Sequence, residues 1–143
     1  LIMKKIILFS TAIVFTLTAM AQTKADSTIK VNEETHDFVK VKQNVPPVYY
    51  FELTNITDKP VVIENTSASC GCTTPDKIVE PIAPGTTVKL KVQYNAANVG
   101  PFSKDVFIKI AGIEQSKTVH IIGEVLTAEA YDIYMKTKGK TGS

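Results

Sequence analysis

Hydrophobic and polar residues alternate in short runs along most of the chain after residue 28. Side chains of an extended strand point alternately to opposite faces, so this period of two predicts strands with one buried face. The clearest runs are residues 48–55, 86–94, 105–110 and 119–125. Weaker strand candidates cover residues 29–31, 36–41 and 61–63, and no convincing amphipathic helix lies between any of these segments.

Turn-forming residues separate these runs. Residues 55–60 predict a turn that joins strands 48–55 and 61–63 into a hairpin, and residues 111–115 predict a second hairpin. Pro84 followed by Gly85 suits the two central positions of a type II turn. About seven short strands with regularly spaced turns predict an all-β fold, an immunoglobulin-like antiparallel β-sandwich over residues 29–126. A small closed barrel is the alternative that the periodicity leaves open.

The segments outside this domain have a different composition. Met3, Lys4 and Lys5 precede an apolar run at residues 6–17, and Ala19-Met20-Ala21 follows it, which predicts a signal peptide over residues 1–21. The run is about a dozen residues, shorter than the roughly 20 that span a bilayer, so no membrane anchor is expected after cleavage. We expect export to the periplasm or the extracellular space, a flexible linker at residues 22–28, and a C-terminal tail at 127–143. The tail has room for one or two helical turns over residues 127–135, followed by a mobile end.

Removal of Lys4 and Lys5 with the signal leaves 14 basic residues against 14 acidic ones, so the predicted mature chain has no net charge. Every basic residue is lysine. Without arginine there is no guanidinium for bidentate contacts to guanine or phosphate, so nucleic acid is not expected as a partner.

Both cysteines of the chain lie in the segment Ser69-Cys70-Gly71-Cys72-Thr73-Thr74-Pro75. Thiols of exported proteins tend to pair, so a Cys70–Cys72 disulfide is one interpretation. In a straight strand the two Cα atoms would be about 7 Å apart, at the outer limit for a disulfide, so a turn is needed and Gly71 permits one. Thr73, Thr74 and Pro75 then predict a turn that leaves the motif.

Two other interpretations of the cysteine pair stay open. A disulfide in so small a ring is easily reduced, which would suit thiol–disulfide exchange, and two thiolates on a turn can bind Cu(I) or, with further ligands, Zn(II). These ions are the only candidate cofactors. The two histidines, His36 and His120, do not have ligand spacing to the cysteines. The motif Ser69, Gly71, Thr73 and Pro75 therefore frames a candidate redox, disulfide or metal pair.

No serine–histidine–aspartate set, paired-carboxylate motif or glycine-rich phosphate loop occurs in the sequence, which leaves little room for acid–base catalysis. The hypothesis that follows is a non-enzymatic binding or assembly module of the bacterial envelope. Its partner would be another envelope protein or a glycan.

The Ser69-Cys70-Gly71-Cys72-Thr73 motif with Pro75 resembles the domain family of unknown function number 1573, found in exported bacterial proteins. The flanking segments agree with this family over approximately residues 33–126, including residues 59–63, 82–85 and 100–104. The resemblance implies an immunoglobulin-like sandwich and no established activity. It implies only that Cys70 and Cys72 form the site.

Overall fold

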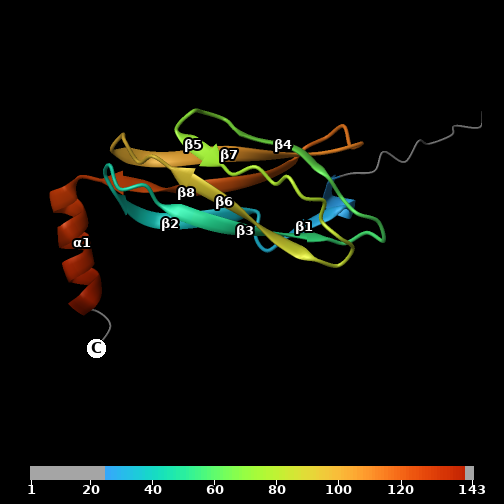
Figure 1. Ribbon diagram of the computed structural model, residues 1–143. Coiled ribbons are helices and arrows are strands. Elements are labelled where there is room, and N and C mark those ends of the chain that lie inside the picture. The colour runs from blue at the N-terminus through green and yellow to red at the C-terminus, as the bar shows by residue number, and fades with distance from the viewer. Residues whose placement is uncertain (1–24, 141–143) are drawn as a thin grey trace, which may run out of the picture.

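The computed structural model describes residues 25–140, in which two four-stranded sheets pack face to face (Figure 1). One sheet has the strand order β1-β3-β6-β5 and the other β2-β8-β7-β4. The strands are β1 (Ile29–Val31), β2 (Thr35–Lys42), β3 (Val48–Asn55), β4 (Ile63–Ala68), β5 (Thr73–Pro75), β6 (Thr87–Tyr94), β7 (Gly100–Ile110) and β8 (Lys117–Leu126). Since each sheet has two distinct edges, the predicted sandwich is confirmed and the closed barrel is not formed.

The alternating runs supply the core between the sheets. Phe51 and Leu53 of β3 and Leu90 of β6 are completely buried, as are Val106 of β7 and Val119 of β8. Strands β7 and β8 pair antiparallel as the second predicted hairpin. The periodicity therefore identifies which face of each long strand is apolar, and burial of that face is the main source of stability.

The first predicted hairpin is wrong, because β3 and β4 belong to different sheets. Asn55, which is fully buried, explains the crossing. Its Nδ2 donates to the carbonyl of Lys59 at 2.7 Å and to that of Ile82 at 2.8 Å, while its Oδ1 accepts from the Thr57 amide at 2.9 Å. These bonds fix the chain in a bend toward the other sheet, and Val61 forms only a single bridge with Ile82.

Two other strand predictions need correction. Thr73–Pro75, expected to be a turn, forms the short edge strand β5, which pairs antiparallel with β6. An edge position tolerates Pro75 because its missing amide faces away from the ladder. In addition, β2 pairs parallel with β8, so the sandwich is not wholly antiparallel, and it has eight strands where about seven were expected.

The two ends of the described chain are also more ordered than expected. In the range predicted as a linker, Ala25–Ser27 forms a short 3-10 helix, η1, and Ala25 is buried in the core. The helix α1 (Ala128–Lys140) is longer than two turns and includes residues predicted to be mobile. The predicted signal peptide, residues 1–21, lies outside the described residues. Between residues 25 and 140, no helix is both long and apolar enough to cross a membrane.

Candidate functional site

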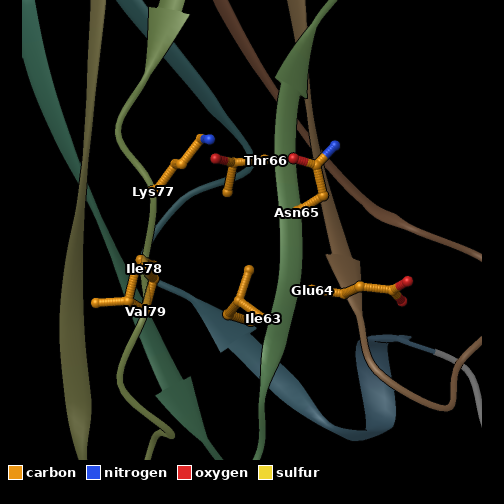
Figure 2. A pocket seen from close by; sticks show the side chains of 7 residues that line it. All are labelled: Ile63, Glu64, Asn65, Thr66, Lys77, Ile78 and Val79. Atoms are coloured by element: carbon orange, nitrogen blue, oxygen red, sulfur yellow. The ribbon is translucent and has the colours of Figure 1, made fainter.

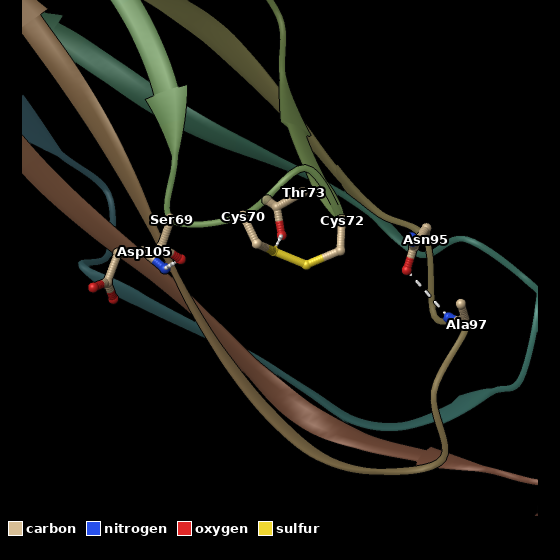
Figure 3. The surroundings of a disulfide bond; sticks show 7 residues. All are labelled: Ser69, Cys70, Cys72, Thr73, Asn95, Ala97 and Asp105. Carbon is tan, nitrogen blue, oxygen red and sulfur yellow. Dashed lines mark hydrogen bonds between the residues drawn. A yellow bond between two sulfur atoms is a disulfide. The ribbon is translucent and has the colours of Figure 1, made fainter.

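The cysteine motif forms the crossover between the two sheets, where the chain leaves edge strand β4 and enters edge strand β5 (Figure 3). Cys70 and Cys72 form a disulfide with their Cα atoms 5.3 Å apart. This distance is shorter than that of a straight strand because the chain turns here: the Thr73 amide donates to the Cys70 carbonyl at 3.3 Å. The structure therefore brings the two predicted site residues together as a disulfide.

Hydrogen bonds attach both sides of this crossover to the sandwich. The Ser69 amide donates to the Asp105 carbonyl at 2.9 Å, and Ser69 Oγ accepts from the Asp105 amide at 3.1 Å. On the other side, the Cys72 carbonyl accepts from the Asn95 amide at 2.9 Å. The side chains of Cys72 and the buried Thr73 face the core. Ser69 and Thr73 thus position the motif between the two sheets.

Gly71 was expected to permit the turn between the two cysteines through the conformational freedom of glycine, but the structure does not use that freedom. Its φ angle lies outside the left-handed region, and a Cβ added to Gly71 would meet no atom within 4 Å. The turn therefore does not need a glycine for steric reasons. Gly71 is exposed, whereas Cys70 and Cys72 on either side of it are half-buried.

The two histidines lie in other clusters. His120 Nδ1 is 2.7 Å from Asp105 Oδ1, and in Figure 3 the Asp105 carboxylate points away from the disulfide. The ring of His36 stacks on Tyr49, with centroids 3.6 Å apart, and its Nδ1 is 2.8 Å from Glu33 Oε1. Hydrogen bonds from Tyr49 and then His36 lower the pKa of Glu33. In the described part of the chain, no three His, Cys, Asp or Glu side chains form a group that could hold a metal ion.

A second candidate site lies along β4 and was not predicted from the sequence (Figure 2). It is an open groove of about 210 Å³ between β4 and the segment that follows β5. Figure 2 shows Lys77 extending toward Thr66 across the groove, with Glu64 pointing outward. The lining residues are Ile63, Glu64, Asn65, Thr66, Lys77, Ile78 and Val79. We call this feature the β4 groove.

Both ends of the β4 groove are closed by contacts between its walls. Thr66 Oγ1 donates to the Asp76 carbonyl at 2.7 Å, and beyond Ile63 the bridge between Val61 and Ile82 joins the same two segments. About four residues of β4 therefore face the groove, which corresponds to a length of about 13 Å. Val79 is 80% exposed and extends the apolar surface to solvent.

The backbone of β4 is unpaired on its outer side. The Ser69 amide bonds to Asp105, and in an antiparallel ladder hydrogen-bonded pairs alternate, so Ser67 and Asn65 also face β7. The amide and carbonyl groups of Thr66 and Ala68 must then point outward. Among the described residues, no backbone hydrogen bond to these outward groups is present. The sequence does not reveal this edge, because the residues of β4 are mostly polar and do not alternate between apolar and polar.

Solved structures place this arrangement in the class of immunoglobulin-like or PapD-like β-sandwiches. A PapD-like domain of human CEP192 has a TM-score of 0.58 at 10% identity, with 71% of this chain and 87% of that chain covered. The VesB protease of Vibrio cholerae gives 0.57 at 14% identity, with 71% and 33% covered. A protein of unknown function from Porphyromonas gingivalis W83 gives 0.58 at 11% identity, with 76% and 51% covered. This chain thus spans about a third of VesB and half of the Porphyromonas protein, and at these identities the likeness concerns the fold alone.

The chain belongs to the family described as protein of unknown function (DUF1573), whose model matches residues 29–125. The resemblance carried by the Cys70–Cys72 motif is thereby confirmed. No curated protein matches the chain.

Proposed function

We propose that this chain is an exported, non-enzymatic binding module that holds an extended segment of another envelope protein along the β4 groove. The observation that carries the proposal is the unpaired outer edge of β4 beside an open groove. An exposed strand edge offers backbone donors and acceptors to an added strand, and pockets beside it select the side chains of that strand.

The lining of the β4 groove defines the chemistry of the segment. Ile78 and the exposed Val79 offer apolar contacts, so the segment carries an apolar side chain that points into the groove. Lys77 extends across the opening, where its ammonium would pair with an acidic side chain or a carbonyl. Since only about four residues of β4 face the groove, the contact is short and the affinity modest.

The cysteine pair has a structural role in this proposal. The disulfide lies just after the end of β4, so it fixes the path by which the chain leaves this open edge strand. Thiol exchange or Cu(I) binding would first require reduction of this bond, and no observation favours either activity. The expectation of no cofactor stays a prediction.

The experiment is site-specific photo-crosslinking in cells that express the chain. A photoreactive residue at Lys77 reports on the β4 groove, and one at Tyr50, which is 50% exposed in β3 of the opposite sheet, is the matched control. We expect one discrete adduct from Lys77 and none from Tyr50. The purified adduct is then digested and analysed by mass spectrometry: a peptide of another protein attached at position 77 would support the proposal, whereas an attached glycan would contradict it. Equal labelling at both positions, or none at Lys77, would refute the proposal.

A further inference from the structure

Helix α1 is attached to the sandwich only near its beginning, and Figure 1 shows the rest of it extending past the end of the sheets. Tyr131 lies in a groove with Phe38, Val45 and Pro47. Asp132 Oδ1 accepts from Lys42 Nζ at 3.0 Å. No residue of α1 is buried.

A helix in this situation has little to stabilise it. Isolated helices shorter than about 12–15 residues are marginal in water, and α1 has 13 residues with Gly139 in its last turn. Helices of this length in proteins owe most of their stability to packing of one face. Part of α1 is therefore expected to pack against another surface.

The outer side of α1 carries a stripe suited to such packing. Ala130, Ile133, Tyr134 and Thr137 follow the spacing i, i+3, i+4 and i+7, which places them on one face of a helix. Ile133 is 64% exposed. Successive residues of a helix are rotated by about 100°, so Asp132, which bonds to the sandwich, lies on the other side of the helix from these four residues. We call these four residues the outer stripe.

Charges beside the outer stripe specify how a partner helix would lie. Glu129, Lys136 and Lys140 are on the same flank of the stripe, with the acidic residue at the start of the helix and the basic residues toward its end. Among the described residues, Glu129 and Lys136 have no ion-pair partner: the salt bridges of the chain involve other groups. A parallel two-fold pair of α1 helices would turn this flank toward Lys138 on the opposite flank of the partner, so lysines would meet lysines. An antiparallel pair places Glu129 opposite Lys136 or Lys140 twice.

We propose that α1 pairs with α1 of a second copy of this chain, antiparallel and two-fold symmetric, through the outer stripe. In such an isologous interface each side chain contributes twice, so Ile133 of one copy meets Tyr134 of the other, and the flank that carries Glu129 forms two opposite-charge pairs. Two helices of this length bury an area at the low end of specific interfaces, so the dimer is weak and depends on concentration. This surface is separate from the β4 groove, so the two proposals succeed or fail independently.

The test is the self-association of residues 22–143, measured by sedimentation equilibrium over a range of concentrations. Ile133→Asp, which places a carboxylate twice in the seam, is expected to weaken the dimer at least about tenfold. The matched control is Ile56→Asp, because Ile56 is 50% exposed but lies in the loop after β3. A chain that is monomeric throughout, or equal effects of the two substitutions, would overturn the proposal.

Reversing the charges of Glu129 and Lys136 distinguishes pairing between two copies from an effect of these charges within a single helix. Glu129→Lys and Lys136→Glu are each expected to weaken the dimer about threefold to tenfold, since each replaces two attractions by two repulsions. The double variant Glu129→Lys/Lys136→Glu restores the pairs and is expected to dimerise like the original chain. If the charges only complement the helix dipole, the double variant would be the worst of the three. Failure of the double variant to recover would overturn the antiparallel arrangement.

Discussion

Cys70 and Cys72 close a loop with a sequence separation of only 2, so their disulfide removes little entropy from the unfolded chain. The segment around them is held by backbone hydrogen bonds to Asp105 and Asn95 that do not depend on the sulfur atoms. At the scale of single residues, the disulfide therefore adds rigidity to a crossover that the fold already defines.

Replacement of both cysteines, Cys70→Ser/Cys72→Ser, is expected to lower the free energy of unfolding by about 1.5 kcal/mol and to leave the fold intact. Urea unfolding monitored by circular dichroism measures this difference. A variant that does not fold, or that loses more than about 3 kcal/mol, would mean that the disulfide is needed to form the crossover.

Lys117 is the buried charge of the described chain, with its side chain 7% exposed. Its Nζ donates to Asp26 Oδ1 and to Glu34 Oε1, both at 2.6 Å, and these carboxylates are mostly exposed. Burial alone would lower the pKa of Lys117, but the hydrogen bonds that its ammonium donates to Asp26 and Glu34 outweigh burial and raise the pKa. The ammonium thus connects η1 and the start of β2 to β8.

Removal of both carboxylates, Asp26→Asn/Glu34→Gln, is expected to destabilise the protein by about 3 kcal/mol, because an unpaired ammonium stays buried. Lys117→Met is expected to be close to neutral, since the two carboxylates it leaves behind are hydrated. Thermal unfolding of the three proteins at neutral pH measures both effects. The opposite order, with Lys117→Met more harmful, would contradict this account of the charge.

The same group fixes the sign of a pH dependence. A raised folded-state pKa means that the stability from Lys117 is fully present below the unfolded value of about 10.4 and is lost as pH rises through the folded value. The difference in free energy of unfolding between the original chain and the Asp26→Asn/Glu34→Gln variant is therefore expected to stay constant between about pH 6 and 8. It is expected to shrink in the alkaline range.

At the scale of elements, the pairing of β7 with β8 depends on a glycine opposite an aromatic ring. Gly123 pairs with Phe102, and a Cβ on Gly123 would lie 2.9 Å from Phe102 Cζ and 3.3 Å from Phe38 Cβ. Phe102 also stacks on Tyr94 of the other sheet, with centroids 4.2 Å apart. The ring is thus held on several sides and has little freedom to move away.

Gly123→Ala is therefore expected to cost about 1–3 kcal/mol through overpacking against Phe102. Chemical unfolding measures the loss, and the control is Gly112→Ala, where φ is +78° but no atom lies within 4 Å of the added Cβ. Gly123→Ala is expected to cost less stability when it is made in the Phe102→Leu variant than when it is made in the original chain. An equal cost in both would show that the backbone, with φ at +157°, causes the loss instead.

The elements that the sequence predicts well are those whose burial is decided by their own alternation. Strand β3 has the predicted bounds, and the buried faces of β6, β7 and β8 agree with the pattern. Strand β4 begins two residues later than expected, because its sequence is mostly polar and its position depends on pairing with β7. Its assignment to the second sheet depends on the buried side chain of Asn55, which no local pattern indicates.

At the scale of the whole molecule, the partners of each strand are decided by contacts between distant segments. The parallel pair β2–β8 joins residues near both ends of the domain, and its register shifts between Asp37 and Lys40. Such pairing cannot be deduced from periodicity. For the same reason the sequence identifies Cys70 and Cys72 but not the β4 groove, whose two walls come from separate segments that meet only in the folded chain.

The central claim is that the outer edge of β4 binds a partner strand, and Thr66 offers the most direct test. Thr66→Pro removes an amide that points away from β7, while Thr66→Ala loses the same hydroxyl bond to Asp76 and keeps that amide. The measurement is the yield of the Lys77 photo-adduct in cells that express each variant. We predict a yield close to the original for Thr66→Ala and a yield near background for Thr66→Pro, with both proteins folded. An undiminished adduct with Thr66→Pro, or equal losses in both variants, would contradict strand addition at this edge.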